Sequence, residues 1–183
     1  MSSISDDVSV SASGAPKILI RGPKNSGKSS FARTLVNSLL TRYKRVMFLE
    51  CDLGQSEFTP GGMVALTLLS QPLFGPPFTH PTLPLAAHYV GAASPRSSPS
   101  HYLKSIEALV RTYEDTNATT ILTDEHDDEP DTRIADSIPL VVNTMGWTKG
   151  LGADLNRRIE EAINPTDIVE FETPVWDPQQ QYW

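Results

Sequence analysis

One short run of residues near the start of the sequence has the types and spacing that hold a chain of phosphates. The run fits the pattern G-x-x-x-x-G-K-[ST] and continues into a further serine: Gly22, Pro23, Lys24, Asn25, Ser26, Gly27, Lys28, Ser29 and Ser30. Glycines let backbone N–H groups turn inward around phosphate oxygens, and the N-terminus of a following helix adds its positive end. We expect Lys28 to reach the β- and γ-phosphates and the Ser29 hydroxyl to bind Mg²⁺.

A magnesium ion at this loop also needs a carboxylate at the end of a neighbouring strand. Asp52 follows the apolar stretch Val46–Cys51 and is predicted to fill that role. The same carboxylate is placed to accept the proton of an attacking hydroxyl. The alternative is the short stretch Thr119–Leu122 with Asp124 and Glu125 after it, an arrangement typical of P-loop ATPases. That stretch leads directly into an acidic run, which favours a solvated loop there. Asp52 is therefore preferred as the carboxylate that binds the metal.

The flanking sequence predicts the elements that position these residues. Lys17–Arg21 is a short apolar run that stops at Gly22, as a buried parallel strand does. Apolar residues then recur at helical spacing from Lys28 until the pattern fades near Tyr43, and Val46–Cys51 reads as a second strand. Strand, helix and strand form a βαβ unit, whose ligands lie at the carboxyl ends of the strands.

The rest of the sequence continues the alternation of strands and helices. Gln71–Pro84 is rich in proline and is predicted to be an extended surface segment without a helix. The further elements are strands at His88–Gly91, Ile138–Asn143 and Asp167–Glu172, and helices at Tyr102–Tyr113, capped by Ser100, and at Leu151–Ile163. This order predicts an α/β fold, a P-loop three-layer sandwich around a mainly parallel sheet.

Length and composition fit one domain in a chain of 183 residues. Residues 1–15 are rich in serine and glycine and are predicted to be a flexible tail, with the core in 16–183. No apolar run approaches the roughly 20 residues that cross a membrane, so we expect no membrane partner. The amino terminus lacks the features of a secretory signal, and the single cysteine, Cys51, favours a reducing compartment.

The formal net charge of −7 counts against a nucleic-acid partner, since Lys and Arg make the contacts to phosphate. The charge is unevenly distributed, however. Lys17 to Leu49 contains basic residues and no acidic residue before Glu50, so this stretch is locally cationic, whereas acids concentrate in 124–131. A GTPase is disfavoured because Asn143, Thr144, Met145 and Gly146 stand where guanine specificity uses Asn-Lys-x-Asp.

Three sets of motifs together resemble the eukaryotic polynucleotide 5′-hydroxyl kinases. They are the phosphate loop, Cys51-Asp52-Leu53-Gly54-Gln55 with Phe58-Thr59-Pro60-Gly61, and Asn143-Thr144-Met145-Gly146-Trp147. Phe74–His80, Ser94-Pro95-Arg96 and Trp147–Gly152 look closer to the branch that acts in ribosomal RNA processing, particularly its fungal members. The resemblance extends from about Ile18 to Glu172.

This resemblance implies transfer of the γ-phosphoryl group of ATP to the 5′-hydroxyl end of RNA with Mg²⁺. It also implies a nuclear, and within it nucleolar, location alongside an RNA-processing nuclease complex. It assigns Lys28 and Ser29 to phosphate and metal, Asp52 to metal and base, and Gln55 to orienting groups around the metal. Ser94 and Pro95 match the segment that grips the RNA, although Ala93 stands where the family often has threonine. Thr144 and Trp147 match a Thr-x-Gly-Trp element, whose indole is expected to stack on a base.

Two departures from the family bear on activity. Members carry flanking domains, and an arginine-bearing lid beyond the Thr-x-Gly-Trp element, whereas this sequence ends at Trp183. An arginine clamp can be worth on the order of 10³-fold in rate. The candidates to replace it are Arg96, Lys149, Arg157 and Arg158. Three hypotheses therefore stand: an RNA 5′-hydroxyl kinase, a nucleotide-binding but catalytically weak scaffold, and a P-loop ATPase that uses Asp124 and Glu125.

Overall fold

The computed structural model describes residues 14–122 and 131–172. Within them the strands are β1 (Lys17–Arg21), β2 (Val46–Glu50), β3 (Met63–Leu69), β4 (Ala86–Tyr89), β5 (Leu140–Asn143) and β6 (Asp167–Glu170). The helices are α1 (Lys28–Leu39), α2 (Pro99–Leu122) and α3 (Leu151–Ile163), with short 3₁₀ turns η1 (Pro77–Thr79) and η2 (Pro95–Ser97).

The strands form one 6-stranded sheet in the order β4-β3-β2-β5-β1-β6. β1, β2, β5 and β6 run parallel, while β3 is antiparallel to β2 and β4 is antiparallel to β3. The α/β fold with a mainly parallel sheet is therefore confirmed. Because β1, β2 and β5 are adjacent and parallel, the segments that follow them meet at one edge of the sheet.

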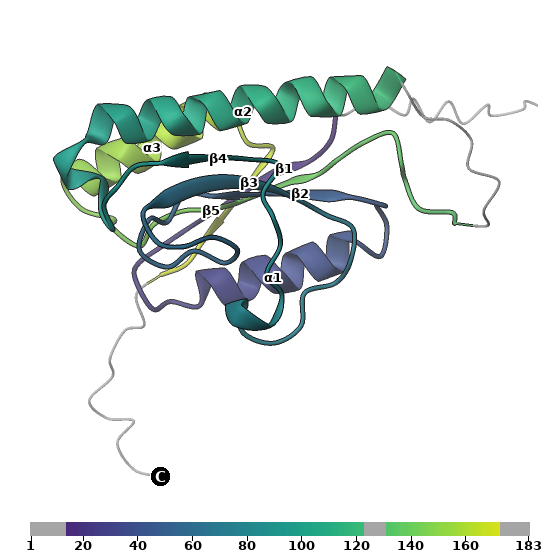
Figure 1. The fold of residues 1–183 in the computed structure, drawn as a ribbon, viewed down its shortest axis with the longest axis horizontal. Coiled ribbons are helices and arrows are strands. Elements are labelled where there is room, and N and C mark those ends of the chain that lie inside the picture. Colours follow the sequence, from purple (N-terminus) through teal and green to yellow (C-terminus); the bar gives the residue numbers. More distant parts are fainter. Residues whose placement is uncertain (1–13, 123–130, 173–183) are drawn as a thin grey trace, which may run out of the picture.

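Side chains of the central strands alternate between two cores. Met47 and Leu49 of β2 pack with α2 and α3, whereas Val46 and Phe48 pack with α1. This period of two is what a strand buried on both faces requires. Figure 1 shows the resulting layers, with α2 and α3 above the sheet and α1 below it. The helix that begins at the phosphate loop is thereby fixed against the sheet.

Helix α2 corrects two sequence-based expectations. It begins at Pro99, so Ser100 lies in its first turn and is not its cap; proline suits the first helical position, where no N–H bond is needed. The helix also runs on to Leu122, so Thr119–Leu122 is not a strand. Its threonines, Thr112, Thr116, Thr119 and Thr120, donate their hydroxyls to carbonyls four residues earlier, which satisfies them within the helix.

Two further segments differ from the sequence-based expectation. Met63–Leu69 was not among the predicted strands, and it forms β3 by pairing along the whole of β2. The proline-rich segment after β3 is largely extended as predicted, yet it contains the 3₁₀ turn η1, and Leu73 is buried against α1 rather than on the surface. Proline at the start of η1 has the φ that a single tight turn needs.

Several predictions fall outside the described residues. These are the flexible tail, apart from Gly14 and Ala15, and the acidic run that includes Asp124 and Glu125. In the part of the chain that the structure describes, no helix is both long and apolar enough to cross a membrane.

Two buried tyrosines of α2 give a matched test of the fold. The Tyr102 hydroxyl donates to the Cys51 carbonyl at 2.7 Å, and the Tyr113 hydroxyl donates to the Ile138 carbonyl at 3.0 Å. We expect Tyr102→Phe and Tyr113→Phe each to lower the free energy of unfolding by about 1 kcal/mol, because each removes one buried hydrogen bond. Urea denaturation followed by circular dichroism measures this. Unchanged midpoints for both variants would contradict the placement of α2 on the sheet.

Candidate functional site: two adjoining cavities at the strand ends

The phosphate loop connects β1 to α1 in a conformation that a triphosphate can enter. Gly27 directly precedes the helix with a φ of 94°, a left-handed value that favours glycine. Lys28 and Ser29 then occupy the first turn of α1. The loop therefore presents the N-terminus of α1 and its unpaired amides toward one enclosed space, the arrangement that binds anions.

That space is a cavity of about 270 Å³, called here the loop cavity. Its lining contains every predicted phosphate-binding residue from Lys24 to Ser30, together with Asp52, Gln55 and Gly146. Gly22 and Pro23 lie outside the lining and form the start of the loop. The structure thus brings the loop, the predicted carboxylate and the predicted glutamine to one place.

The Lys28 ammonium is held inside the loop. Its side chain is 7% exposed, and Nζ donates to the Pro23 carbonyl oxygen at 2.8 Å. Burial lowers the pKa of Lys28, while the nearby carboxylates of Asp52 and Glu50 oppose that shift. A phosphate entering the cavity would supply the negative charge and the acceptor oxygens that the buried ammonium favours.

Asp52 is positioned by the turn that follows β2. Its Oδ1 accepts hydrogen bonds from the backbone N–H groups of Gly54 at 2.8 Å and Gln55 at 3.2 Å. A carboxylate held by successive amides in this way has a fixed direction. The same turn places Gln55 beside Asp52, which explains why both residues line the loop cavity.

A buried pair beneath the loop was missed by sequence reasoning. Glu50 and Asn143, the last residues of β2 and β5, are register partners and are each 1% exposed. The Asn143 amide donates to Glu50 Oε1 at 3.1 Å and to the Ser29 hydroxyl at 3.3 Å. Glu50 also accepts from the Asp52 N–H at 2.9 Å. The only sequence signal for Glu50 was its position two residues before Asp52, where an acidic residue ends an apolar strand.

Burial affects both members of the Glu50–Asn143 pair. Burial raises the pKa of the Glu50 carboxyl to about 8, and the hydrogen bonds from the Asp52 N–H and the Asn143 amide oppose the shift. The Asn143 Oδ1 atom is buried and has no hydrogen-bond partner among the residues that the structure describes. A buried acceptor without a partner is costly and is expected at a place where an ion or water completes the structure.

These oxygens fit Mg²⁺. The Ser29 hydroxyl and the Asp52 carboxylate line one cavity, and the amide nitrogen of Asn143 donates to the Ser29 hydroxyl. Among the described residues, no group of three or more His, Cys, Asp or Glu side chains is arranged to hold a metal. That composition suits Mg²⁺ rather than a metal bound by a full protein cage, because Mg²⁺ is usually held by one or two protein oxygens, phosphates and water.

A second cavity of about 540 Å³, called here the outer cavity, adjoins the first. It is lined by Lys24, Asp52, Leu53, Gly54, Gln55, Ala93, Ser94, Pro95, Arg96, Met145, Gly146 and Trp147. Lys24, Asp52, Gln55 and Gly146 line both cavities. Gly146 allows this close junction, since a Cβ there would lie 2.6 Å from the Lys24 Cα.

Three of the four predicted RNA contacts meet in the outer cavity. Ser94, Pro95 and Trp147 line it, although they come from segments far apart in the sequence. Thr144 does not line it: the residue is buried, and its hydroxyl donates to the Ile20 carbonyl at 2.8 Å. Thr144 joins β5 to β1, and contact between its side chain and RNA stays a prediction.

Trp147 is held by the start of α3. Gly152 lies so close that a Cβ on it would be 2.3 Å from the Trp147 Cγ, and the Asn156 amide donates to the Trp147 carbonyl at 3.2 Å. The guanidinium carbon of Arg96 lies 5.1 Å from the centroid of the Trp147 ring. The indole is therefore fixed from one side and covered by a cation from another.

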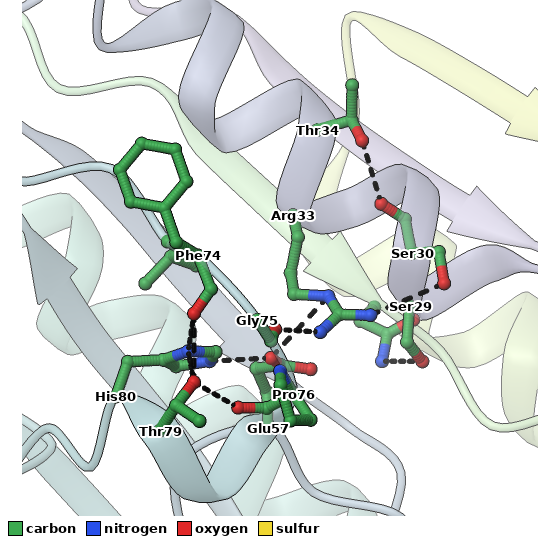
Figure 2. A network of polar contacts seen from close by, with 12 residues as sticks. Ser29, Ser30, Arg33, Thr34, Glu57, Phe74, Gly75, Pro76, Thr79 and His80 are labelled. Carbon is green, nitrogen blue, oxygen red and sulfur yellow. Dashed lines mark hydrogen bonds and ion pairs between the residues drawn. The ribbon is translucent and has the colours of Figure 1, made fainter.

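A polar network on the α1 face anchors the proline-rich segment. Figure 2 shows buried Glu57 between His80, whose Nε2 lies 2.8 Å from Oε1, and Arg33, whose Nε lies 3.7 Å from the same oxygen. Arg33 also donates to the Gly75 carbonyl at 2.6 Å. Glu57 in turn donates its N–H to Glu50 at 3.3 Å. The network links the turn after Asp52 to α1, and sequence patterns gave no signal for it.

Known proteins resemble this chain in sequence. A family model described as "mRNA cleavage and polyadenylation factor CLP1 P-loop" matches residues 22–176. Polynucleotide 5′-hydroxyl-kinase GRC3 of Cryptococcus neoformans is 45% identical over 160 residues, which are 85% of this chain and 21% of the relative. The NOL9 kinase of Danio rerio is 37% identical over 156 residues, covering 85% of this chain and 19% of the relative. The chain spans about a fifth of the length of these curated relatives.

Solved structures share the fold. A wild-type Clp1p–Pcf11p complex contains a chain that aligns with a TM-score of 0.66 at 21% identity, covering 94% of this chain and 40% of the other. A second structure of the same pair, described by an extended interface and ATP loss in a point mutant, aligns with a TM-score of 0.64 at 18% identity and covers 91% of this chain and 39% of the other. The fold, the phosphate loop and the family match agree, and the chain belongs to the CLP1 P-loop family.

Proposed function

We propose that this chain is the catalytic core, within residues 16–183, of an ATP-dependent RNA 5′-hydroxyl kinase. One observation carries the proposal: Asp52 lines both the loop cavity and the outer cavity. A carboxylate at such a junction can face a phosphoryl donor on one side and a hydroxyl acceptor on the other. Transfer between two bound substrates requires that geometry, because the attacking and leaving oxygens must lie roughly in line with the transferred phosphorus.

The loop cavity is the site for the donor. Backbone amides of Lys24 to Ser30 and the positive end of α1 surround the triphosphate, and Lys28 moves from the Pro23 carbonyl to the β- and γ-phosphates. Ser29 and Asp52 would hold Mg²⁺. The bound ion would neutralise charge on the β- and γ-phosphate oxygens.

The outer cavity is the site for the acceptor. Its volume of about 540 Å³ lies within the range of small-molecule sites and accommodates a nucleoside. The acceptor's 5′-hydroxyl donates a hydrogen bond to Asp52, which accepts the proton as the oxygen attacks the γ-phosphorus. Gln55 orients the groups around the metal. Ser94 and Pro95 grip the RNA end, and Trp147 provides an aromatic face for its base.

The names of the relatives support the acceptor class. GRC3 of Cryptococcus neoformans and NOL9 of Danio rerio are both named polynucleotide 5′-hydroxyl kinases. We extend this to RNA as the polynucleotide, to ribosomal RNA processing as the setting and to the nucleolus as the location, because the motifs at Phe74–His80 and Ser94–Arg96 resemble that branch. A nuclease complex is the expected protein partner, and the Clp1p–Pcf11p complex shows this fold carrying a bound protein.

A second candidate is a nucleotide-binding protein with weak catalysis that acts as a scaffold. The observation in its favour is the lining of the loop cavity, which contains Lys24 and Lys28 but no arginine among the described residues. The ATPase alternative loses its basis, because Thr119–Leu122 is helical. Transfer of labelled γ-phosphate from ATP to a 5′-hydroxyl oligoribonucleotide separates the kinase from the scaffold, in which nucleotide binds without transfer.

Lys28→Ala tests the donor site. We expect the variant to lose transfer by on the order of 100-fold or more, since one charged contact to the transition state is removed. It should also bind ATP more weakly in a calorimetric titration, because the triphosphate loses a buried cation. Lys104→Ala, an exposed lysine of α2, is the matched control and should behave like the wild type. Normal transfer by Lys28→Ala would disprove the donor assignment.

Asp52→Asn tests the base. Asparagine retains an oxygen that can accept from the Gly54 and Gln55 amides, so the turn should persist while the proton acceptor is lost. We expect transfer to fall by roughly 10²- to 10⁴-fold, with ATP affinity largely kept. Asp115→Asn on the exposed side of α2 is the control. If rapid-quench kinetics give near-normal transfer for Asp52→Asn, Asp52 is not the base.

A further inference from the structure

We propose that Arg96 binds the phosphate attached to the 3′-oxygen of the acceptor's first nucleoside, so that the outer cavity selects a nucleotide chain over a free nucleoside. This inference rests on the proposed function and adds a subsite to it. The ligand class is a 5′-hydroxyl nucleoside that carries a 3′-phosphate, whether as a monophosphate or as the first internucleotide linkage of RNA.

The first support is the place of Arg96 in the fold. It lies in the turn η2, directly after Ser94 and Pro95, and all three residues line the outer cavity. The Ser94 hydroxyl accepts from the Arg96 N–H at 3.4 Å, while the Pro95 ring is buried. The buried proline anchors the turn, and the exposed arginine that follows it lines the cavity.

The second support is the absence of an anionic partner. Arg21, Arg33, Arg133 and Arg157 each form an ion pair with a carboxylate, whereas within residues 14–122 and 131–172 no carboxylate lies within 4.0 Å of Arg96. Within the same residues its side chain makes no hydrogen bond, and its guanidinium carbon lies 5.1 Å from the centroid of the Trp147 ring. Stacking of this kind leaves the N–H groups at the edge of the guanidinium free to donate.

The third support is the chemistry of the guanidinium. Its planar set of N–H donors can bind two oxygens of a phosphate at once. Charge-assisted hydrogen bonds of this type are among the strongest in proteins. Asp52 marks where the 5′-hydroxyl must lie, and Arg96 lines the same cavity, whose volume of about 540 Å³ accommodates a nucleoside. A phosphate one sugar away from the reacting hydroxyl can therefore be bound by Arg96.

This position separates the role of Arg96 from that of a clamp on the transferred phosphoryl group. Arg96 lines the outer cavity and is not part of the lining of the loop cavity. A clamp would act on every acceptor equally, since it touches the group that all reactions share. A subsite for the 3′-phosphate acts only on acceptors that carry one.

Two acceptors that differ by a single phosphate test the inference in the full chain. Adenosine and adenosine 3′-monophosphate are compared by kcat/KM for transfer of labelled phosphate from ATP. We expect the wild type to prefer the 3′-phosphorylated acceptor. Arg96→Ala should lower kcat/KM for that acceptor by about 10- to 100-fold and leave adenosine nearly unchanged. Arg96→Lys, which keeps the positive charge without the planar guanidinium, should give an intermediate loss of kcat/KM for the 3′-phosphorylated acceptor.

Arg111→Ala, an exposed arginine of α2, is the matched control and should not discriminate between the acceptors. With a 5′-hydroxyl oligoribonucleotide, Arg96→Ala should also lower the slope of log Kd against log salt by about 0.7, as expected for one lost contact to single-stranded phosphate. If Arg96→Ala lowered kcat/KM equally for both acceptors, Arg96 would be a clamp on the transferred phosphoryl group. If it lowered kcat/KM for neither, Arg96 would not contact the acceptor. Either result overturns the inference.

A direct binding measurement keeps the inference separate from the proposed function. Calorimetric titration of adenosine 3′-monophosphate, with Mg²⁺ and ADP present, should give weaker binding to Arg96→Ala than to the wild type. If the wild type phosphorylates neither acceptor, the kinase proposal fails and this titration decides the Arg96 subsite by itself. Equal affinities of the two proteins would then reject the subsite.

Discussion

The structure depends on the buried contact between Glu50 and Asn143. These residues end β2 and β5, and their hydrogen bond fixes the two strand ends beneath the phosphate loop. From this pair, one bond reaches Ser29 in α1 and another reaches the backbone of Asp52. A polar pair this deeply buried is stable only when its bonds are made, so the positions of loop, helix and carboxylate are coupled. The pair therefore sets where a donor and an acceptor can meet.

The division of the site into two cavities follows from the same strand ends. The loop after β1 encloses the smaller cavity, while the segment after β5 and the turn before α2 enclose the larger one. Gly146 lets the segment after β5 approach Lys24 closely, which makes the cavities adjoin at Asp52. Cationic residues are divided as well: Lys24 lines both cavities, whereas Lys28 lines only the loop cavity and Arg96 lines only the outer cavity.

Local patterns predicted the unit β1–α1–β2 well, because apolar strands, a glycine loop and helical spacing coincide there. The same patterns could not distinguish Thr119–Leu122 as a strand from the end of a long helix, since a short apolar run fits both. Glu50 and Asn143 were not assigned as a pair, because their contact is made between two strands far apart in the sequence. Thr144 lies in a motif predicted to contact RNA, yet its hydroxyl joins two strands, a contact that only the tertiary structure reveals.

A crystal structure of the full chain with Mg²⁺, a non-hydrolysable ATP analogue and a 5′-hydroxyl dinucleotide tests the account most directly. The account predicts the triphosphate in the loop cavity and the nucleoside in the outer cavity. The 5′-oxygen should lie about 3 to 3.5 Å from the γ-phosphorus and within hydrogen-bond reach of Asp52. A triphosphate outside the loop, or an Asp52 side chain turned away from both the metal and the hydroxyl, would contradict it.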